Sequence, residues 1–181
     1  YGASSLSGTL RLITNKPDAS KFSAGIDLDA NKFGKGAAGG TAEAFVNIPL
    51  GEKAAIRLVG FYEHDGGYID NTPATRTYTL NDDDPSTNVT INNDKFVKKN
   101  FNDVDTYGGR AALKLDLSDD WTVMPAFIYQ RQVAHGNFLY DPRAGDLKVH
   151  DFTPDINKDR WYQAALTIQG KLSDWDITYA G

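Results

Sequence analysis

Apolar and polar residues alternate one by one along much of this chain, and this alternation constrains its fold more than any other feature. In residues 21–32, KFSAGIDLDANK, every second position is apolar, and these positions are Phe22, Ala24, Ile26, Leu28 and Ala30. Successive side chains of a β-strand point to opposite faces, so this stretch predicts a strand with one apolar and one polar face. A helix would bring Asp27 and Asp29 beside the apolar residues and leave no continuous apolar stripe.

The same pattern recurs along the chain, which makes the predicted fold class all-β. The further stretches are residues 41–50, 55–64, 105–117, 121–132, 160–172 and the chain from 175 onward. Pro125 lies inside one of these predicted strands. Because proline cannot donate to a strand ladder, we expect a bulge or weakened pairing at that position.

The connections between the predicted strands alternate in length. PLGEK, LSDD and LSD are tight turns of the kind that joins hairpins, whereas GKGAAGG is of moderate length and residues 65–103 and 133–159 are long. If the strands pair in chain order, all the short turns lie at one end of the sheet and all the long loops at the other. This asymmetry is typical of an antiparallel transmembrane β-barrel of an outer membrane.

Aromatic residues at both ends of the predicted strands favour the same architecture. The apolar face carries tryptophan just after two short turns, at Trp121 and Trp175. It carries tyrosine near the long loops, at Tyr62, Tyr107, Tyr129 and Tyr162. Amphipathic aromatics gather at the two interfaces of a membrane, and about 9–11 tilted strand residues suffice to cross it. A soluble β-sandwich or carbohydrate-binding module would also alternate, but its loops would not segregate by length.

Composition excludes several classes of function. The formal net charge is −5, whereas a protein that binds nucleic acid usually carries a basic face, so we expect no nucleic-acid partner. The chain has no cysteine, which excludes disulfides and thiolate chemistry. No apolar run approaches the roughly 18 residues of a transmembrane helix.

No motif points to catalysis, a cofactor or a metal ion. The glycine-rich residues 34–41, GKGAAGGT, have their lysine too early for a phosphate-binding loop and lead into a predicted strand. The acidic residues 82–84 do not fit the spacing of a calcium loop. His64, His135 and His150 share no metal-ligand spacing, so we expect solvated loop histidines, with ligand capture by His135 or His150 left open. We therefore expect a protein that is not an enzyme, with no cofactor and no metal site.

The first residues carry a resemblance to a known family. Residues 1–17, YGASSLSGTLRLITNKP, followed directly by amphipathic strands, resemble the TonB-dependent receptors of bacterial outer membranes, and residues 45–71 resemble the early barrel of that family. The resemblance implies that residues 1–17 end a plug domain, with a strand at 9–14 and an exit at Pro17. It implies that residues 18–181 form about seven strands of a plugged barrel of about 22 strands. Ser7 stands where the family commonly has glycine.

The function implied by this resemblance is active uptake of a scarce nutrient across the outer membrane. A ferric siderophore is the commonest substrate class, and the energy would come from a TonB–ExbB–ExbD complex that engages the plug. A passive porin is the main alternative within the membrane class. It would have the same strands without the end of a plug, so residues 1–17 favour the receptor.

Candidate site residues follow from loop position and side-chain type. Polar and aromatic residues of the long loops are the predicted ligand-binding residues, and these are Tyr68, Asp70, Tyr78, His135, Phe138, Tyr140 and Arg143. Arg11 in the predicted plug strand is a candidate partner for Asp27 or Asp29 on the inner wall, in a buried pair that would hold the plug.

Overall fold

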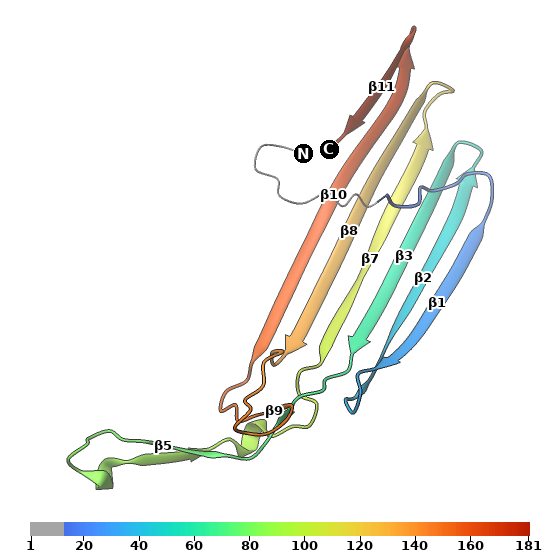
Figure 1. Ribbon diagram of the computed structural model, residues 1–181. Helices are drawn as coiled ribbons and strands as arrows, with labels where there is room; N and C mark the ends of the chain where they lie inside the picture. Colours follow the sequence, from blue (N-terminus) through green and yellow to red (C-terminus); the bar gives the residue numbers. More distant parts are fainter. Residues whose placement is uncertain (1–12) are drawn as a thin grey trace.

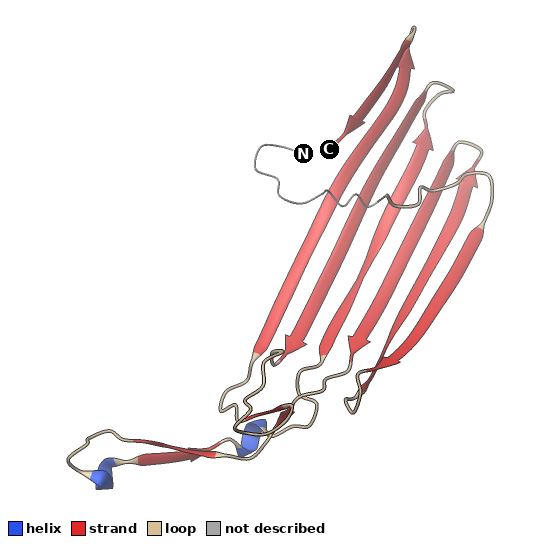
Figure 2. Ribbon diagram, in the orientation of Figure 1, coloured by secondary structure: helices blue, strands red, loops and turns tan. Residues whose placement is uncertain are grey.

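The computed structural model of this protein describes residues 13–181 and is all-β, as predicted. Seven strands form one antiparallel sheet, and they pair in the order in which they follow one another along the chain (Figures 1 and 2). They are β1 Ser23–Lys32, β2 Ala38–Gly51, β3 Ala54–Asp65, β7 Val104–Asp116, β8 Trp121–His135, β10 Ile156–Leu172 and β11 Trp175–Ala180. These strands confirm the alternating stretches of the sequence.

The sheet is open rather than closed. Within the described residues β1 and β11 lie at its two edges, and each pairs with one neighbour only. Closure into a barrel therefore stays a prediction. The predicted plug strand at 9–14 falls almost entirely outside the described residues, and Ile13 and Thr14 belong to no strand.

The segregation of connections by length is confirmed. The turns β2–β3, β7–β8 and β10–β11 lie at one end of the sheet, and the longer connections lie at the other (Figure 1). Pro125 weakens the pairing of β8 on one side only. It pairs with Leu166 of β10, but the ladder to β7 stops at Ala112 and Ala126 and resumes at Leu115 in an unchanged register. The expected bulge does not form there.

The registers place the predicted apolar residues on one continuous face. Residues that pair across strands share a face, so Ala42, Tyr62 and Tyr107 lie in one row. Large side chains on this apolar face are open to the surroundings; Leu28 is 69% exposed and Tyr162 is 71% exposed. The buried residues of the sheet all lie on the opposite, polar face, and they are Asn47, Ala55, Thr106, Ala112 and Met124. The buried residues of the sheet thus lie on its polar face, other residues of that face such as Asn31 are exposed, and the apolar face is open to the surroundings.

Residues 13–22 cross the sheet near the short turns (Figure 1), and their contacts with Arg110 and Asn47 place them on its polar face. Pro17 is buried in this crossing segment. The guanidinium of Arg110 in β7 donates to the carbonyl of Asn15 over 3.3 Å, and the ammonium of Lys16 lies 3.5 Å from Oε1 of Gln169 in β10. The crossing segment thus contacts β7 and β10, which are separated in the sheet by β8.

The two longest connections, residues 66–103 and 136–155, fold together into what we call the loop unit. Strand β4, Asp70–Asn71, pairs in parallel with β9, Lys148–Val149. Strands β5, Thr75–Tyr78, and β6, Val89–Asn92, form a hairpin that projects away from the sheet (Figure 1). Two short 3₁₀ turns, η1 Pro85–Thr87 and η2 Asp94–Phe96, complete the unit (Figure 2). Its small core consists of Ile69, Phe101 and Val149, with Tyr68 packed against it.

None of the helical turns within residues 13–181 has the length and apolar character needed to span a membrane.

Candidate functional site

Buried asparagines order the loop unit. Oδ1 of Asn102 accepts from the backbone N–H groups of Tyr68 and Ile69, at 2.7 and 2.8 Å. The amide of Asn71 is bonded to the backbone of Asp151 in both directions, at 2.9 and 3.1 Å. The Asn71 amide thus both donates and accepts, whereas Asn102 only accepts, and within the described residues its buried Nδ2 has no hydrogen-bond partner. Residues 66–103 are thereby fixed against residues 136–155.

Asn93 extends this network. Its Nδ2 donates to the carbonyls of Thr72 and Asp151, at 2.9 and 3.2 Å, and its Oδ1 accepts from the N–H of Ala74 at 2.7 Å. One oxygen of the Asp151 carboxylate is buried and makes no hydrogen bond to any part of the chain that the structure describes. Burial, with a further contribution from Asp155, raises the pKa of Asp151 above its ordinary value.

A hollow of about 600 Å³ opens in the loop unit, and two of the predicted ligand-binding residues, Tyr140 and Arg143, line it. Its wall also contains Arg76, whose guanidinium lies 4.7 Å from the ring centre of Phe152. Arg143 donates twice to the carboxylate of Asp141, at 3.0 and 2.9 Å, so the pKa of Asp141 is lowered and that of Arg143 is raised. Arginines and aromatic rings together suit an anionic ligand with a planar group.

The remaining predicted ligand-binding residues lie elsewhere. Tyr68 and Asp70 line a second hollow of about 460 Å³, where the ring of Phe33 lies 5.8 Å from that of Tyr68. Asp70 accepts from the backbone N–H of Asn100 at 2.9 Å. Tyr78 and Phe138 are exposed and line neither hollow. The structure therefore pairs Tyr140 with Arg143 in one hollow and Tyr68 with Asp70 in another, leaves the other three predicted residues outside both, and ligand binding itself stays a prediction.

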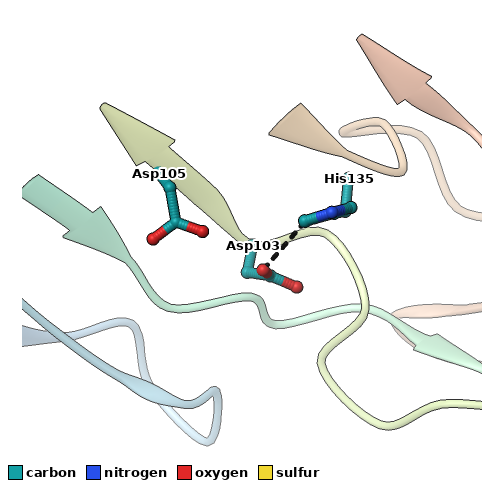
Figure 3. A group of neighbouring side chains, drawn as sticks. All are labelled: Asp103, Asp105 and His135. Atoms are coloured by element: carbon teal, nitrogen blue, oxygen red, sulfur yellow. Dashed lines mark hydrogen bonds and ion pairs between the residues drawn. The ribbon is translucent and has the colours of Figure 1, made fainter. Parts of the chain in front are cut away.

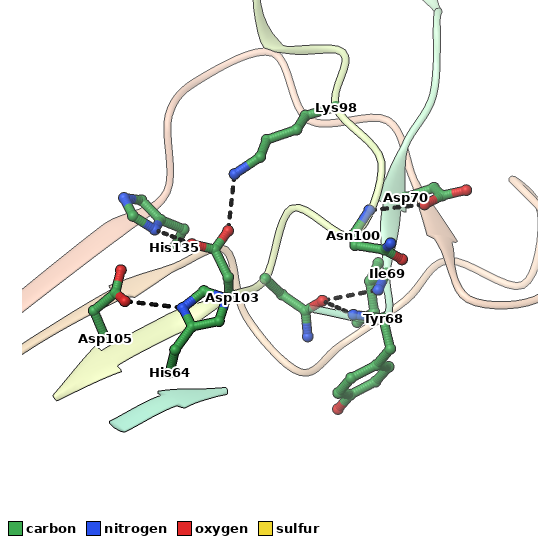
Figure 4. A network of polar contacts seen from close by, with 10 residues as sticks. His64, Tyr68, Ile69, Asp70, Lys98, Asn100, Asp103, Asp105 and His135 are labelled. Carbon is green, nitrogen blue, oxygen red and sulfur yellow. Dashed lines mark hydrogen bonds and ion pairs between the residues drawn. The ribbon is translucent and has the colours of Figure 1, made fainter. Parts of the chain in front are cut away.

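His135 belongs to a polar cluster where the strands meet the loop unit, which we call the junction cluster (Figure 4). Its Nδ1 lies 3.0 Å from Oδ2 of Asp103, and the ammonium of Lys98 donates to the other oxygen of Asp103 at 2.8 Å. Burial alone would raise the pKa of Asp103, but Lys98 and His135 outweigh it, so the pKa of this carboxyl lies below its ordinary value. The carboxylate is thus held ionised.

A second aspartate joins the junction cluster from β7. Nδ1 of His64 lies 2.9 Å from Oδ1 of Asp105, and the hydroxyl of Tyr62 donates to the same oxygen at 2.6 Å. The ligand atoms of Asp103, Asp105 and His135 all lie within 4.8 Å of one another (Figure 3).

The histidines differ from their predicted role. His150 is exposed in a loop, as expected, but His64 and His135 are half-buried ends of strands with carboxylate partners. Linear spacing could not find this cluster because its members come from separate strands. The LSDD turn indicates a hairpin in the sequence, but the turn alone does not fix which residues pair. The observed pair of Val104 with Ala134 sets the register, and this register places residue 103 opposite residue 135.

The predicted plug contact falls partly outside the described residues, because Arg11 does. Asp27 and Asp29 lie on the polar face as predicted, and within residues 13–181 neither forms an ion pair. Asp27 lines a hollow of about 500 Å³ that also touches Ile13, Arg57 and Arg110. The pair with Arg11 stays a prediction.

No family model matches the chain, and neither a curated protein nor a solved structure shows significant similarity to it.

Proposed function

We propose that this chain forms part of the wall of an outer-membrane β-barrel that takes up a scarce nutrient, a ferric siderophore being the first substrate class to test. One observation carries the proposal: the sheet exposes a continuous apolar face and buries residues on its polar face. A soluble sheet does the reverse, because the hydrophobic effect drives apolar side chains out of water.

The apolar face suits lipid. It extends over all seven strands, whereas contiguous exposed apolar patches on soluble monomers rarely exceed a few hundred Å². Trp175 and Trp121 border it near the short turns, and Tyr62 and Tyr162 border it toward the long loops. This is the order expected of a strand that crosses two membrane interfaces. The short turns would then face the periplasm and the loop unit the outside.

The crossing segment supports a plugged receptor over an open porin. Residues 13–17 lie against the polar face, which would line the interior of a barrel. Pro17 is buried there, and Asn47 fixes the backbone just beyond it. In the proposed receptor this segment is the last part of a plug, and a TonB–ExbB–ExbD complex acts on the plug to admit the ligand.

The loop unit is the proposed place of ligand capture. Its buried asparagines pre-order the wall of the larger hollow, and Arg76, Tyr140 and Arg143 offer charge and a ring to an anionic ligand. Pre-ordering lowers the entropy cost of binding, as a receptor for a dilute nutrient requires.

Energised uptake by cells that produce the protein tests this function. We expect accumulation of a labelled ferric siderophore that stops when a protonophore collapses the proton motive force. We expect Arg143→Ala to reduce binding at least tenfold and Phe138→Ala, which alters an exposed loop residue outside both hollows, to leave it unchanged. Uptake that continues without the proton motive force would indicate a passive porin and contradict the receptor. A chain found only in the soluble fraction would overturn the membrane assignment.

A further inference from the structure

We propose that Asp103, Asp105 and His135 form a binding site for a divalent transition-metal ion such as Zn²⁺, at the point where both long loops leave the sheet. The donors are two carboxylates and one imidazole, which are ordinary ligands of zinc. Their ligand atoms lie within 4.8 Å of one another. A tetrahedral ion with bonds of about 2.1 Å separates its ligands by about 3.4 Å, so side-chain rotations that shorten the widest separation by about 1.4 Å suffice.

The backbone holds these donors at a fixed spacing. Asp103 lies directly before β7, Asp105 lies within it, and His135 is the last residue of β8. The N–H of His135 donates to the carbonyl of Asp103 at 2.9 Å, which continues the ladder beyond the named strands. All three residues therefore lie on one face of adjacent strands, and sites built on strands are more precise than sites built on loops.

A cation already occupies part of this position. The ammonium of Lys98 lies 2.8 Å from Asp103 and compensates one of two neighbouring negative charges. The Lys98 side chain is 59% exposed, so it can swing into water without losing a buried environment. A divalent ion would replace it and would balance both carboxylates. Lys98 is therefore a competitor of the metal, and its removal is a specific test.

The surroundings of the cluster orient its ligands as metal sites require. His64 and Tyr62 both bond Oδ1 of Asp105, at 2.9 and 2.6 Å, and within residues 13–181 no side chain forms a hydrogen bond with its second oxygen. Hydrogen bonds of this kind fix the orientation of a carboxylate that binds a metal ion. Three protein ligands leave a fourth position for water or an exchangeable group.

Metal binding would link the two long loops at the positions where they meet the sheet. Asp103 ends residues 66–103, and His135 directly precedes residues 136–155. A metal ion bonded to both would restrain the loop unit from the side of the sheet, in addition to the restraint supplied by its asparagines. This inference concerns a site separate from the two hollows and does not depend on the identity of the transported nutrient.

Calorimetric titration of the full chain with zinc chloride, in detergent micelles at pH 7, tests the proposal. We expect one saturable site, at least tenfold weaker binding in His135→Ala, and several-fold tighter binding in Lys98→Met. His150→Ala and Lys99→Met are matched controls, because both alter exposed residues outside the cluster, and we expect no change in either.

Cobalt provides a second readout that does not depend on affinity alone. Co²⁺ in a site of low coordination number absorbs visible light strongly, and we expect that band in the wild type and in Lys98→Met but not in His135→Ala. Circular dichroism of each variant verifies that the sheet is retained. Absence of saturable zinc binding in the wild type, or unchanged affinity in a folded Lys98→Met variant, would overturn the proposal.

Discussion

Asn47 and Asp18 bind one another through a reciprocal pair of hydrogen bonds. The N–H of Asp18 donates to Oδ1 of Asn47 at 2.9 Å, and Nδ2 of Asn47 donates to the carbonyl of Asp18 at 2.8 Å. The same Nδ2 donates to the carbonyl of Lys21 at 2.8 Å. A side chain of β2 thus takes the place of a neighbouring strand and fixes the course of the chain before it enters β1.

Replacement of Asn47 by alanine should release the crossing segment from the sheet. The change removes three hydrogen bonds to part-buried backbone groups of Asp18 and Lys21, which costs about 1–2 kcal/mol. Hydrogen exchange at the amide of Asp18 should accelerate accordingly. Asn31→Ala is the control, because Asn31 lies on the same face but is exposed. Equal exchange rates in the two variants would show that Asn47 does not hold the segment.

Ile69→Ala should loosen the loop unit and leave the sheet intact. Ile69 is fully buried between Phe101 and Val149, and truncation of a buried isoleucine costs about 2–5 kcal/mol. We expect faster hydrogen exchange in residues 66–103 and 136–155 but not in β7 or β8. Ile91→Ala in the exposed hairpin serves as the control. Faster exchange throughout the sheet would contradict an independently cored loop unit.

The stability of the loop unit should carry a pH dependence from Asp151. Because its pKa is raised in the folded protein, chiefly by burial, the neutral carboxyl is favoured there. Its contribution is therefore most favourable below the ordinary pKa of 3.8 and is lost as pH rises through the folded pKa.

Asp151→Asn removes that pH dependence and should stabilise the loop unit at neutral pH. We expect a gain of roughly 0.5 kcal/mol, kept small because the carboxylate is partly exposed. Unfolding monitored by hydrogen exchange at pH 7 and at acid pH measures it, with Asp146→Asn on the loop surface as the control. If Asp151→Asn stabilised the loop unit equally at pH 7 and at acid pH, the gain would not arise from the ionisation of Asp151.

A charged residue placed on the apolar face should lower the free energy of unfolding, whereas the same charge one residue further along, on the polar face, should change it little. Leu28 lies midway along β1 on the apolar face, and Asp29 lies on the polar face. An arginine at mid-membrane on the lipid side of a barrel costs about 2–4 kcal/mol. Guanidinium unfolding in micelles should therefore show a clear loss for Leu28→Arg and little change for Asp29→Arg. Similar losses in both variants would count against a lipid-facing side.

The alternation of single residues was enough to predict the strands and their faces. Side chains alternate between the two faces of a strand, so Ile26 and Tyr62 lie on the apolar face only together with every second residue of their strands. A register shift of one residue would move all of these side chains to the polar face, so the alternation also constrains the register. The short turns then fix the hairpins, and Pro125 shows the limit of such reasoning: it interrupts one ladder without a shift of register.

The loop unit and the junction cluster could not be predicted in the same way. The loop unit depends on Asn71, Asn93 and Asn102, whose side chains bond backbone groups up to 80 residues away without any period in the sequence. The junction cluster combines Asp103 and Asp105 with His135, and only the register of β7 and β8 brings these residues together.

Tryptophan quenching by a brominated detergent tests the membrane assignment most directly. Trp175 is 75% exposed on the apolar face and Trp161 is 40% exposed on the polar face. In micelles of the brominated detergent, a variant with Trp175 as its single tryptophan should lose most of its fluorescence, and one with Trp161 alone should keep it. Acrylamide, a quencher dissolved in water, should act in the opposite order. Equal quenching of the two tryptophans, or a monodisperse folded monomer without any detergent, would contradict a lipid-facing sheet.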